Sequence, residues 1–234
     1  MQPELVLTEG AGGFALVAAG RIAAEMNRIV NGRGICTVAV SGGDTPRPVY
    51  EKLASEEFSL QIPWNKTHLL FSDERCVPPE DSASNYRMVY ETLLGNGRLS
   101  PAGIERIRGE EENRQEAARE YENRLPAELD LLLLGMGVDG HTASLFPGSP
   151  ALDETTRRVL PVEGPISPRF RITITRPVIE TARSIIVLVA GEAKAEMVAR
   201  AIEGPYDPRK IPAQLALGGT WILDRAAAGR LTAK

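Results

Sequence analysis

The feature that most constrains this fold is a series of short, uniformly apolar runs separated by longer helical patterns. Residues 37–40 read TVAV and residues 131–134 read LLLL, without alternation of apolar and polar side chains. This pattern is typical of parallel strands that are covered by helices on both faces. We therefore expect an α/β fold, a single-domain three-layer α/β/α sandwich over residues 1–234 with a mostly parallel sheet.

The elements expected from this pattern follow one another along the whole chain. Strands are predicted at residues 5–7, 35–40, 69–71, 131–134, 172–175, 185–190 and 221–223. The first helix has an apolar face formed by Ala15, Ala18, Ile22, Met26 and Ile29. A second helix is expected to begin with Thr45 as its N-cap and Pro46 at its first position. Further helices are predicted at 85–94, 114–125, 192–202 and 225–231, and loops at 147–150, 161–168 and 204–212.

Composition excludes several classes of protein. The 234 residues are 43% hydrophobic and 25% charged, which is close to the globular average. Two cysteines and two histidines cannot build a disulfide framework or a histidine-rich metal cage. No basic tract, signal peptide or long apolar run is present, so neither nucleic acid nor a membrane is an expected partner. We expect a cytoplasmic protein that is a monomer or a small homo-oligomer.

Candidate functional residues follow predicted strands, where open parallel sheets bind their ligands. The first such loop contains Ser41, Gly42, Gly43 and Thr45, with Arg47 just beyond. Glycines allow a ligand close to the backbone, and the amides that open a helix attract phosphate. An ordinary strand-to-helix turn needs the same residue types, so both interpretations stay open at this point.

The second loop, after residues 69–71, contains Asp73 and Arg75. A guanidinium fixed at a strand end suits an oxyanion, because its planar fork donates two hydrogen bonds. A local ion pair on a solvated loop is the alternative interpretation.

The third loop reads GMGVDGHTASLFPG over residues 135–148 and holds the densest set of candidates. Imidazole exchanges protons near neutral pH, so His141 is a candidate acid–base catalyst. Asp139 is the nearer candidate to orient it, although Asp73 is the alternative. The glycines at 135, 137 and 140 match a dinucleotide fingerprint, but Pro147 and Pro150 interrupt the helix that this motif requires.

Together, the three loops resemble the 6-phosphogluconolactonase family. The resemblance is carried by residues 41–46 (SGGDTP), 73–78 (DERCVP) with 84–85 (SN), and 135–148, and weaker similarity runs from about residue 5 to 231. It implies a fold like that of glucosamine-6-phosphate deaminases and hydrolysis of 6-phosphoglucono-δ-lactone in the pentose phosphate pathway, without metal or cofactor. It also implies that His141 is catalytic, and that Arg171 and Lys194 join the Ser41–Thr45 turn in binding phosphate.

The residues themselves are compatible with this chemistry. We hypothesise that His141 deprotonates a water that attacks the lactone carbonyl, while Asp139 holds the imidazole ring. Either Arg75 or backbone N–H groups of the loops would face the developing negative charge. Two alternatives remain open. An amino-sugar-phosphate deaminase typically carries a glutamate shortly after this histidine, where Ser144, Leu145 and Phe146 stand here. A non-catalytic sugar-phosphate sensor would need a DNA-binding element, for which the N-terminal residues leave no room.

Overall fold

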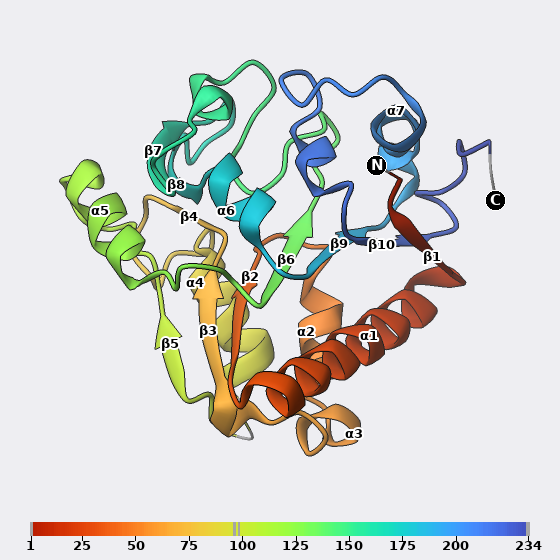
Figure 1. Ribbon diagram of the computed structural model, residues 1–234, viewed down its shortest axis with the longest axis horizontal. Coiled ribbons are helices and arrows are strands. Elements are labelled where there is room, and N and C mark those ends of the chain that lie inside the picture. Colours follow the sequence, from red (N-terminus) through yellow and green to blue (C-terminus); the bar gives the residue numbers. More distant parts are fainter. Residues whose placement is uncertain (1, 96, 98, 233–234) are drawn as a thin grey trace.

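The computed structural model describes residues 2–95, 97 and 99–232, which form a parallel sheet flanked by helices (Figure 1). Within these residues the main sheet has seven strands in the order β1-β10-β9-β6-β2-β3-β5, and every neighbouring pair is parallel. Its strands are β1 (Glu4–Thr8), β2 (Cys36–Val40), β3 (Thr67–Phe71), β5 (Gly103–Glu105), β6 (Leu131–Gly135), β9 (Ile185–Val189) and β10 (Thr220–Asp224). The predicted α/β fold with a mostly parallel sheet is confirmed.

The central strands are buried on both faces, as their uniformly apolar sequences predict. In β6, residues Leu131, Leu132, Leu133 and Leu134 are each at most 1% exposed. Burying one leucine side chain contributes about 1.5–3 kcal/mol, so this strand alone is a substantial part of the core.

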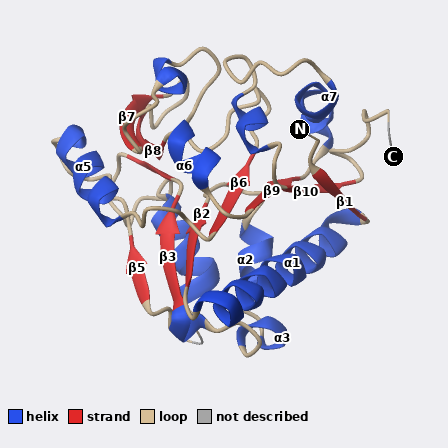
Figure 2. Ribbon diagram, viewed as in Figure 1, coloured by secondary structure: helices blue, strands red, loops and turns tan. Residues whose placement is uncertain are grey.

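Helices cover the two faces of the sheet. They are α1 (Gly10–Arg33), α2 (Arg47–Leu53), α3 (Glu56–Ser59), α4 (Asn85–Val89), α5 (Arg114–Arg124), α6 (Arg176–Thr181) and α7 (Ala195–Glu203). Helices α1 and α2 pack together on one side of the strands, whereas α6 and α7 lie on the other (Figure 2). Helix α1 buries Ala18, Ile22, Met26 and Ile29 as predicted, and it ends at Gly34, whose φ of 83° reverses the chain.

A second, smaller sheet was not predicted. It contains β4 (Asp73–Arg75), β8 (Phe170–Ile174) and β7 (Val159–Glu163), and both of its strand pairs are antiparallel. Residues 73–75 were expected in a loop and 161–168 entirely in a loop, so these two expectations were wrong. The strand predicted at 172–175 is present as β8, although it belongs to this second sheet and not to the main one. Pro161 is tolerated within β7 because this is an edge strand, where a missing amide donor costs little.

Two helix predictions also need correction, and a third is confirmed with a change of helix type. Residues 225–231 form successive turns instead of a helix, because the Asp224 carboxylate accepts the amide of Ala227 at 2.7 Å and closes the chain locally. Helix α2 begins at Arg47, after Pro46, and has no side-chain cap, so Thr45 is not its N-cap. The predicted helix at 85–94 is α4 continued by a π-helical turn, η2 (Tyr90–Leu94).

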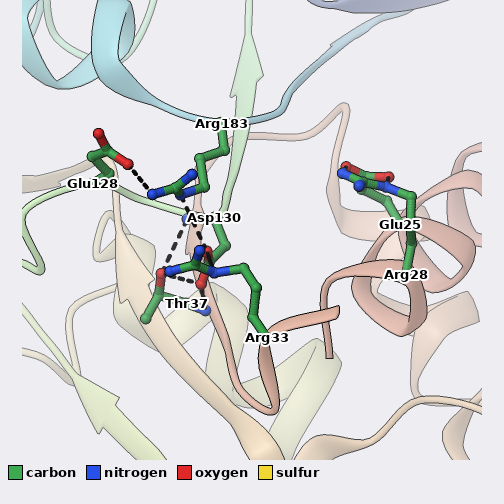
Figure 3. A network of polar contacts seen from close by, with 7 residues as sticks. All are labelled: Glu25, Arg28, Arg33, Thr37, Glu128, Asp130 and Arg183. Carbon is green, nitrogen blue, oxygen red and sulfur yellow. Dashed lines mark hydrogen bonds and ion pairs between the residues drawn. The ribbon is translucent and has the colours of Figure 1, made fainter. Parts of the chain in front are cut away.

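A polar network stabilises the amino ends of β2 and β6 (Figure 3). Asp130, directly before β6, is 3% exposed and accepts hydrogen bonds of 2.9 Å from the amide and hydroxyl of Thr37. The Nε atom of Arg33 lies 2.8 Å from Asp130 Oδ1, although without hydrogen-bond alignment. Arg183 bridges Asp130 and Glu128. This network joins the strand ends that are farthest from the pocket described next.

Candidate active site

A pocket of about 150 Å³ lies where the three predicted loops meet, at the carboxyl ends of the parallel strands. It is lined by Ser41, Gly42, Gly43, Asp44, Thr45, Pro46, Asp73, Arg75, Asn85, Gly135, Met136, Gly137, His141, Ala143, Arg171 and Lys194. Apart from Asp139 and Arg47, every predicted site residue lines this pocket. Asp139 reaches the pocket only through His141, and Arg47 does not line it.

A larger pocket of about 740 Å³ lies at the opposite, amino ends of β9 and β10. Its lining includes Ile185 and Thr220 and contains none of the predicted site residues. The smaller pocket is the candidate active site because charged side chains converge there, whereas the larger pocket contains none of the predicted residues.

His141 and Asp139 form a close pair within the third loop. The distance between His141 Nδ1 and Asp139 Oδ1 is 2.5 Å, and the same oxygen accepts the His141 amide at 3.1 Å. Partial burial raises the pKa of Asp139, but the hydrogen bond and charge of His141 outweigh it and leave that pKa below its ordinary value. Gly137 makes room for the pair, because a Cβ there would lie 2.2 Å from the imidazole.

The turn after His141 is tight and strained. Ala143 has a φ of 47°, in the left-handed region that side chains rarely adopt, and the Leu145 amide donates to the Thr142 carbonyl at 2.9 Å. Phe146 then packs beside the imidazole, with 4.8 Å between the ring centroids. The same phenyl ring lies 5.3 Å from the Arg171 guanidinium, so it contacts two groups of the pocket.

Asp73 does not pair with His141. It is 5% exposed, and its Oδ2 accepts the Ser144 hydroxyl at 2.6 Å. Its Oδ1 accepts weaker bonds from Ser72 and Asn85, at 3.2 and 3.3 Å. Of the two carboxylates that the sequence leaves open as partners of the imidazole, Asp139 makes the contact.

Asn85 lines the pocket and Glu74 accepts its backbone amide, although neither residue was assigned a role from the sequence. Glu74 is 3% exposed and accepts the amides of Arg75, Asn85 and Tyr86, each at 2.7 Å. Asn85 in turn donates from its side chain to the Asp73 carbonyl at 2.9 Å. The signals in the sequence were their position beside the charged candidates of the second loop and their place in the family motifs at 73–78 and 84–85.

The first loop offers several unused hydrogen-bonding groups. No hydrogen bond among the described residues uses the amides of residues 42–45, and the buried Ser41 hydroxyl has no partner there. Gly43 has a φ of 100°, which favours glycine. The Thr45 hydroxyl accepts from the Lys194 ammonium at 3.2 Å, which connects this loop to residues far along the chain.

Three cationic side chains reach the pocket. Burial lowers the pKa of Lys194, opposed by the charges of Asp44 and Asp224. Burial also lowers the pKa of Arg171, and the nearby positive charge of Arg75 lowers it further. Arg75 donates to the Ala83 carbonyl at 2.6 Å, while its Nε is buried with no hydrogen-bond partner in the described structure. Positive charge held away from water and incompletely paired is suited to binding an anion.

Comparison with known proteins identifies the class to which this fold and site belong. The sequence profile of the family described as glucosamine-6-phosphate isomerases/6-phosphogluconolactonase matches residues 11–223, so the chain belongs to this family.

Within that family the chain groups with the 6-phosphogluconolactonases, which are lactone hydrolases. It is 38% identical over 200 residues to the 6-phosphogluconolactonase of Haemophilus influenzae, covering 81% of this chain and 85% of the relative. It is 35% identical over 224 residues to that of Synechocystis sp., covering 90% of each chain. The predicted family is confirmed.

Solved structures agree with the fold. The crystal structure of a 6-phosphogluconolactonase from Shewanella baltica superimposes with a TM-score of 0.86 at 26% identity, covering 95% of this chain and 97% of the other. A monomeric glucosamine-6-phosphate deaminase gives 0.83 at 20% identity, covering 97% and 99%, which supports the predicted deaminase-like fold. No described helix is long and apolar enough to cross a membrane.

Proposed function

We propose that this chain hydrolyses 6-phospho-D-glucono-1,5-lactone to 6-phospho-D-gluconate, in the oxidative part of the pentose phosphate pathway. The observation that carries the proposal is one pocket that holds a carboxylate-paired histidine together with a glycine-rich loop, the buried Arg171 and the half-buried Arg75 and Lys194. Such a pocket offers both a proton acceptor for water and an anchor for a phosphate. Membership among the 6-phosphogluconolactonases supports the same substrate.

The His141–Asp139 contact determines which ring nitrogen is available for chemistry. Because Nδ1 faces the Asp139 carboxylate at 2.5 Å, Nδ1 carries the proton and Nε2 is left as the base. His141 Nε2 takes a proton from water as the water oxygen bonds to the lactone carbonyl carbon. The same proton then passes to the ring oxygen as its bond to that carbon breaks. Acid–base help of this kind is typically worth about 10²–10⁴-fold.

The developing oxyanion needs a positive partner, and we assign this role to Arg75, which lines the pocket. A single donor of this kind contributes roughly 3–4 kcal/mol. A covalent acyl-enzyme is disfavoured because the nearby Ser144 is 0% exposed and its hydroxyl donates to Asp73. Direct attack by water is therefore the simpler route.

The phosphate is assigned to the other groups of the pocket. Lys194 and Arg171 supply charge, and the unused amides of the first loop supply directed hydrogen bonds. The net charge of −4 cannot attract a dianion over long distances, so these local groups must provide the affinity. Arg47 is the weakest of the predicted phosphate ligands because it does not line the pocket.

The experiment that tests this function offers two substrates to the purified chain. Hydrolysis of 6-phosphogluconolactone is measured against its spontaneous rate at mildly acidic pH, where that background is slow, and ammonia release from glucosamine 6-phosphate is measured in parallel. We expect rapid lactone hydrolysis and no ammonia. Ammonia without lactone hydrolysis would identify a deaminase, and tight binding of 6-phosphogluconate without either reaction would identify a sensor.

A further inference from the structure

A buried polar chain connects the first loop of the pocket to the turn that carries His141. At one end, the Asn85 carboxamide packs against Gly42 so closely that a Cβ at residue 42 would lie 1.8 Å from Asn85 Oδ1. The side-chain Nδ2 of Asn85 donates to the Asp73 backbone carbonyl at 2.9 Å and to Asp73 Oδ1 at 3.3 Å. At the other end, Asp73 Oδ2 accepts the Ser144 hydroxyl at 2.6 Å, three residues after His141.

The three side chains that form this buried polar chain are shielded from solvent. Asn85 is 2% exposed, Asp73 5% and Ser144 0%. Buried polar groups are costly unless they are paired, so each one is confined to the geometry in which its partners are satisfied. The buried polar chain therefore holds segments that are far apart in the sequence at a fixed distance from one another in the fold.

Glu74 holds the backbone around Asn85 in place. Its Oε1 accepts the Asn85 amide at 2.7 Å, and its Oε2 accepts the Tyr86 amide at 2.7 Å and the Ser84 hydroxyl at 3.1 Å. The start of helix α4 is thereby held against strand β4, so the Asn85 side chain has little freedom to move away from Gly42 or Asp73.

We propose that Asn85 is a positioning residue that, through Asp73, sets the distance between the phosphate-binding loop and His141. This inference rests on the proposed function, in which a phosphate and a lactone carbonyl of one molecule occupy the two ends of the pocket. A displacement of about 1 Å between such groups can cost about 10²-fold in rate. Asn85 itself takes no part in the bond changes.

The first test compares two lactones in the Asn85→Ala variant. Positioning matters only when the phosphate anchor is engaged. We therefore expect kcat/KM for 6-phosphogluconolactone to fall about 10- to 100-fold, whereas that for unphosphorylated glucono-δ-lactone changes little. Asn113→Ala is the matched control, because Asn113 caps α5 away from the pocket, and it should leave both values unchanged. An equal fall with both lactones, or no fall with either, would overturn the proposal.

The second test uses the contact with Gly42 and needs no turnover. Gly42 does not have a positive φ, so alanine fits its backbone, and the three atoms nearest to the added Cβ all belong to the Asn85 carboxamide. We expect Gly42→Ala to weaken 6-phosphogluconate binding about tenfold in the otherwise unchanged chain, and far less when combined with Asn85→Ala. The same loss in both backgrounds would show that Asn85 does not govern the loop. If the chain hydrolyses no lactone, the proposed function fails. The comparison of 6-phosphogluconate affinities with and without Asn85→Ala still tests whether Asn85 positions the first loop.

Discussion

Arg75 on strand β4 lies directly opposite Arg171 on strand β8 in the antiparallel register of the small sheet. Like charges in this relationship destabilise a sheet, and the positive charge of Arg75 contributes to the lowered pKa of Arg171. Among the described residues neither guanidinium has an ion pair with a carboxylate. A bound anion would relieve this repulsion. We therefore expect anion binding to increase the stability of the folded protein.

The first prediction concerns this linkage. 6-Phosphogluconate should raise Tm, by an amount equivalent to about 2.7 kcal/mol at a hundredfold excess over Kd. Arg171→Ala and Lys194→Ala should each weaken that binding about 10- to 100-fold, because each removes a charged hydrogen-bond donor. Calorimetric titration checks the affinity, with Arg176→Ala on the surface of α6 as the control. Unchanged affinity in both variants would refute the phosphate assignment.

The second prediction concerns Asp139. Asparagine keeps the size of this side chain but removes the charge that holds the His141 Nδ1 proton, so Asp139→Asn should lower kcat by about 10²-fold or more. KM should change little, since Asp139 does not line the pocket. Steady-state kinetics separate the two values. Asp153→Asn, which removes a surface ion pair with Arg209, is the control, and a rise in KM at constant kcat would contradict the assigned role.

The third prediction concerns the pH dependence of stability. Burial raises the pKa of Glu74 above its ordinary value of 4.5, despite the amides that it accepts. The folded protein therefore holds this proton more tightly than the unfolded chain. The resulting stabilisation is complete below pH 4.5 and is lost as the pH rises through the folded-state pKa.

Urea unfolding measured across this pH range tests whether the stabilisation by Glu74 decreases as the pH rises. The free energy of unfolding of the unchanged chain, relative to Glu74→Gln, should decrease as the pH rises from about 4.5. A difference that grows with rising pH would mean that Glu74 is stabilised as the charged form.

The fourth prediction separates stability from activity. Asp130→Ala removes two hydrogen bonds to Thr37 and the ionic contact with Arg33, but Arg33 remains half exposed and is not left buried without a partner. We expect a loss of about 1–3 kcal/mol in the free energy of unfolding. KM and kcat of the folded protein should be unchanged, because Asp130 lies at the amino end of β6 and the pocket at its carboxyl end. A change in kcat or KM without a decrease in the free energy of unfolding would contradict this prediction.

The sequence was informative where structure depends on local pattern. The apolar run at 131–134 predicted a buried parallel strand, and His141 with Asp139 could be paired because they are two residues apart. Strand β4 was missed because three polar residues become a strand only through pairing with β8, about a hundred residues later. The partners of Asp73 could not be predicted for the same reason, since Ser144 is 71 residues away. Local pattern reveals which residues are chemically suited to a site, whereas distant pairing decides what each one touches.

The most direct measurement is the rate of 6-phosphogluconolactone hydrolysis by His141→Ala, compared with the unchanged chain and with buffer alone at mildly acidic pH. His141 is the base in our account, so the variant should lose about 10²-fold or more in kcat while still binding 6-phosphogluconate through Lys194 and Arg171. Circular dichroism confirms that the variant is folded. Hydrolysis by folded His141→Ala at the rate of the unchanged chain would contradict the account.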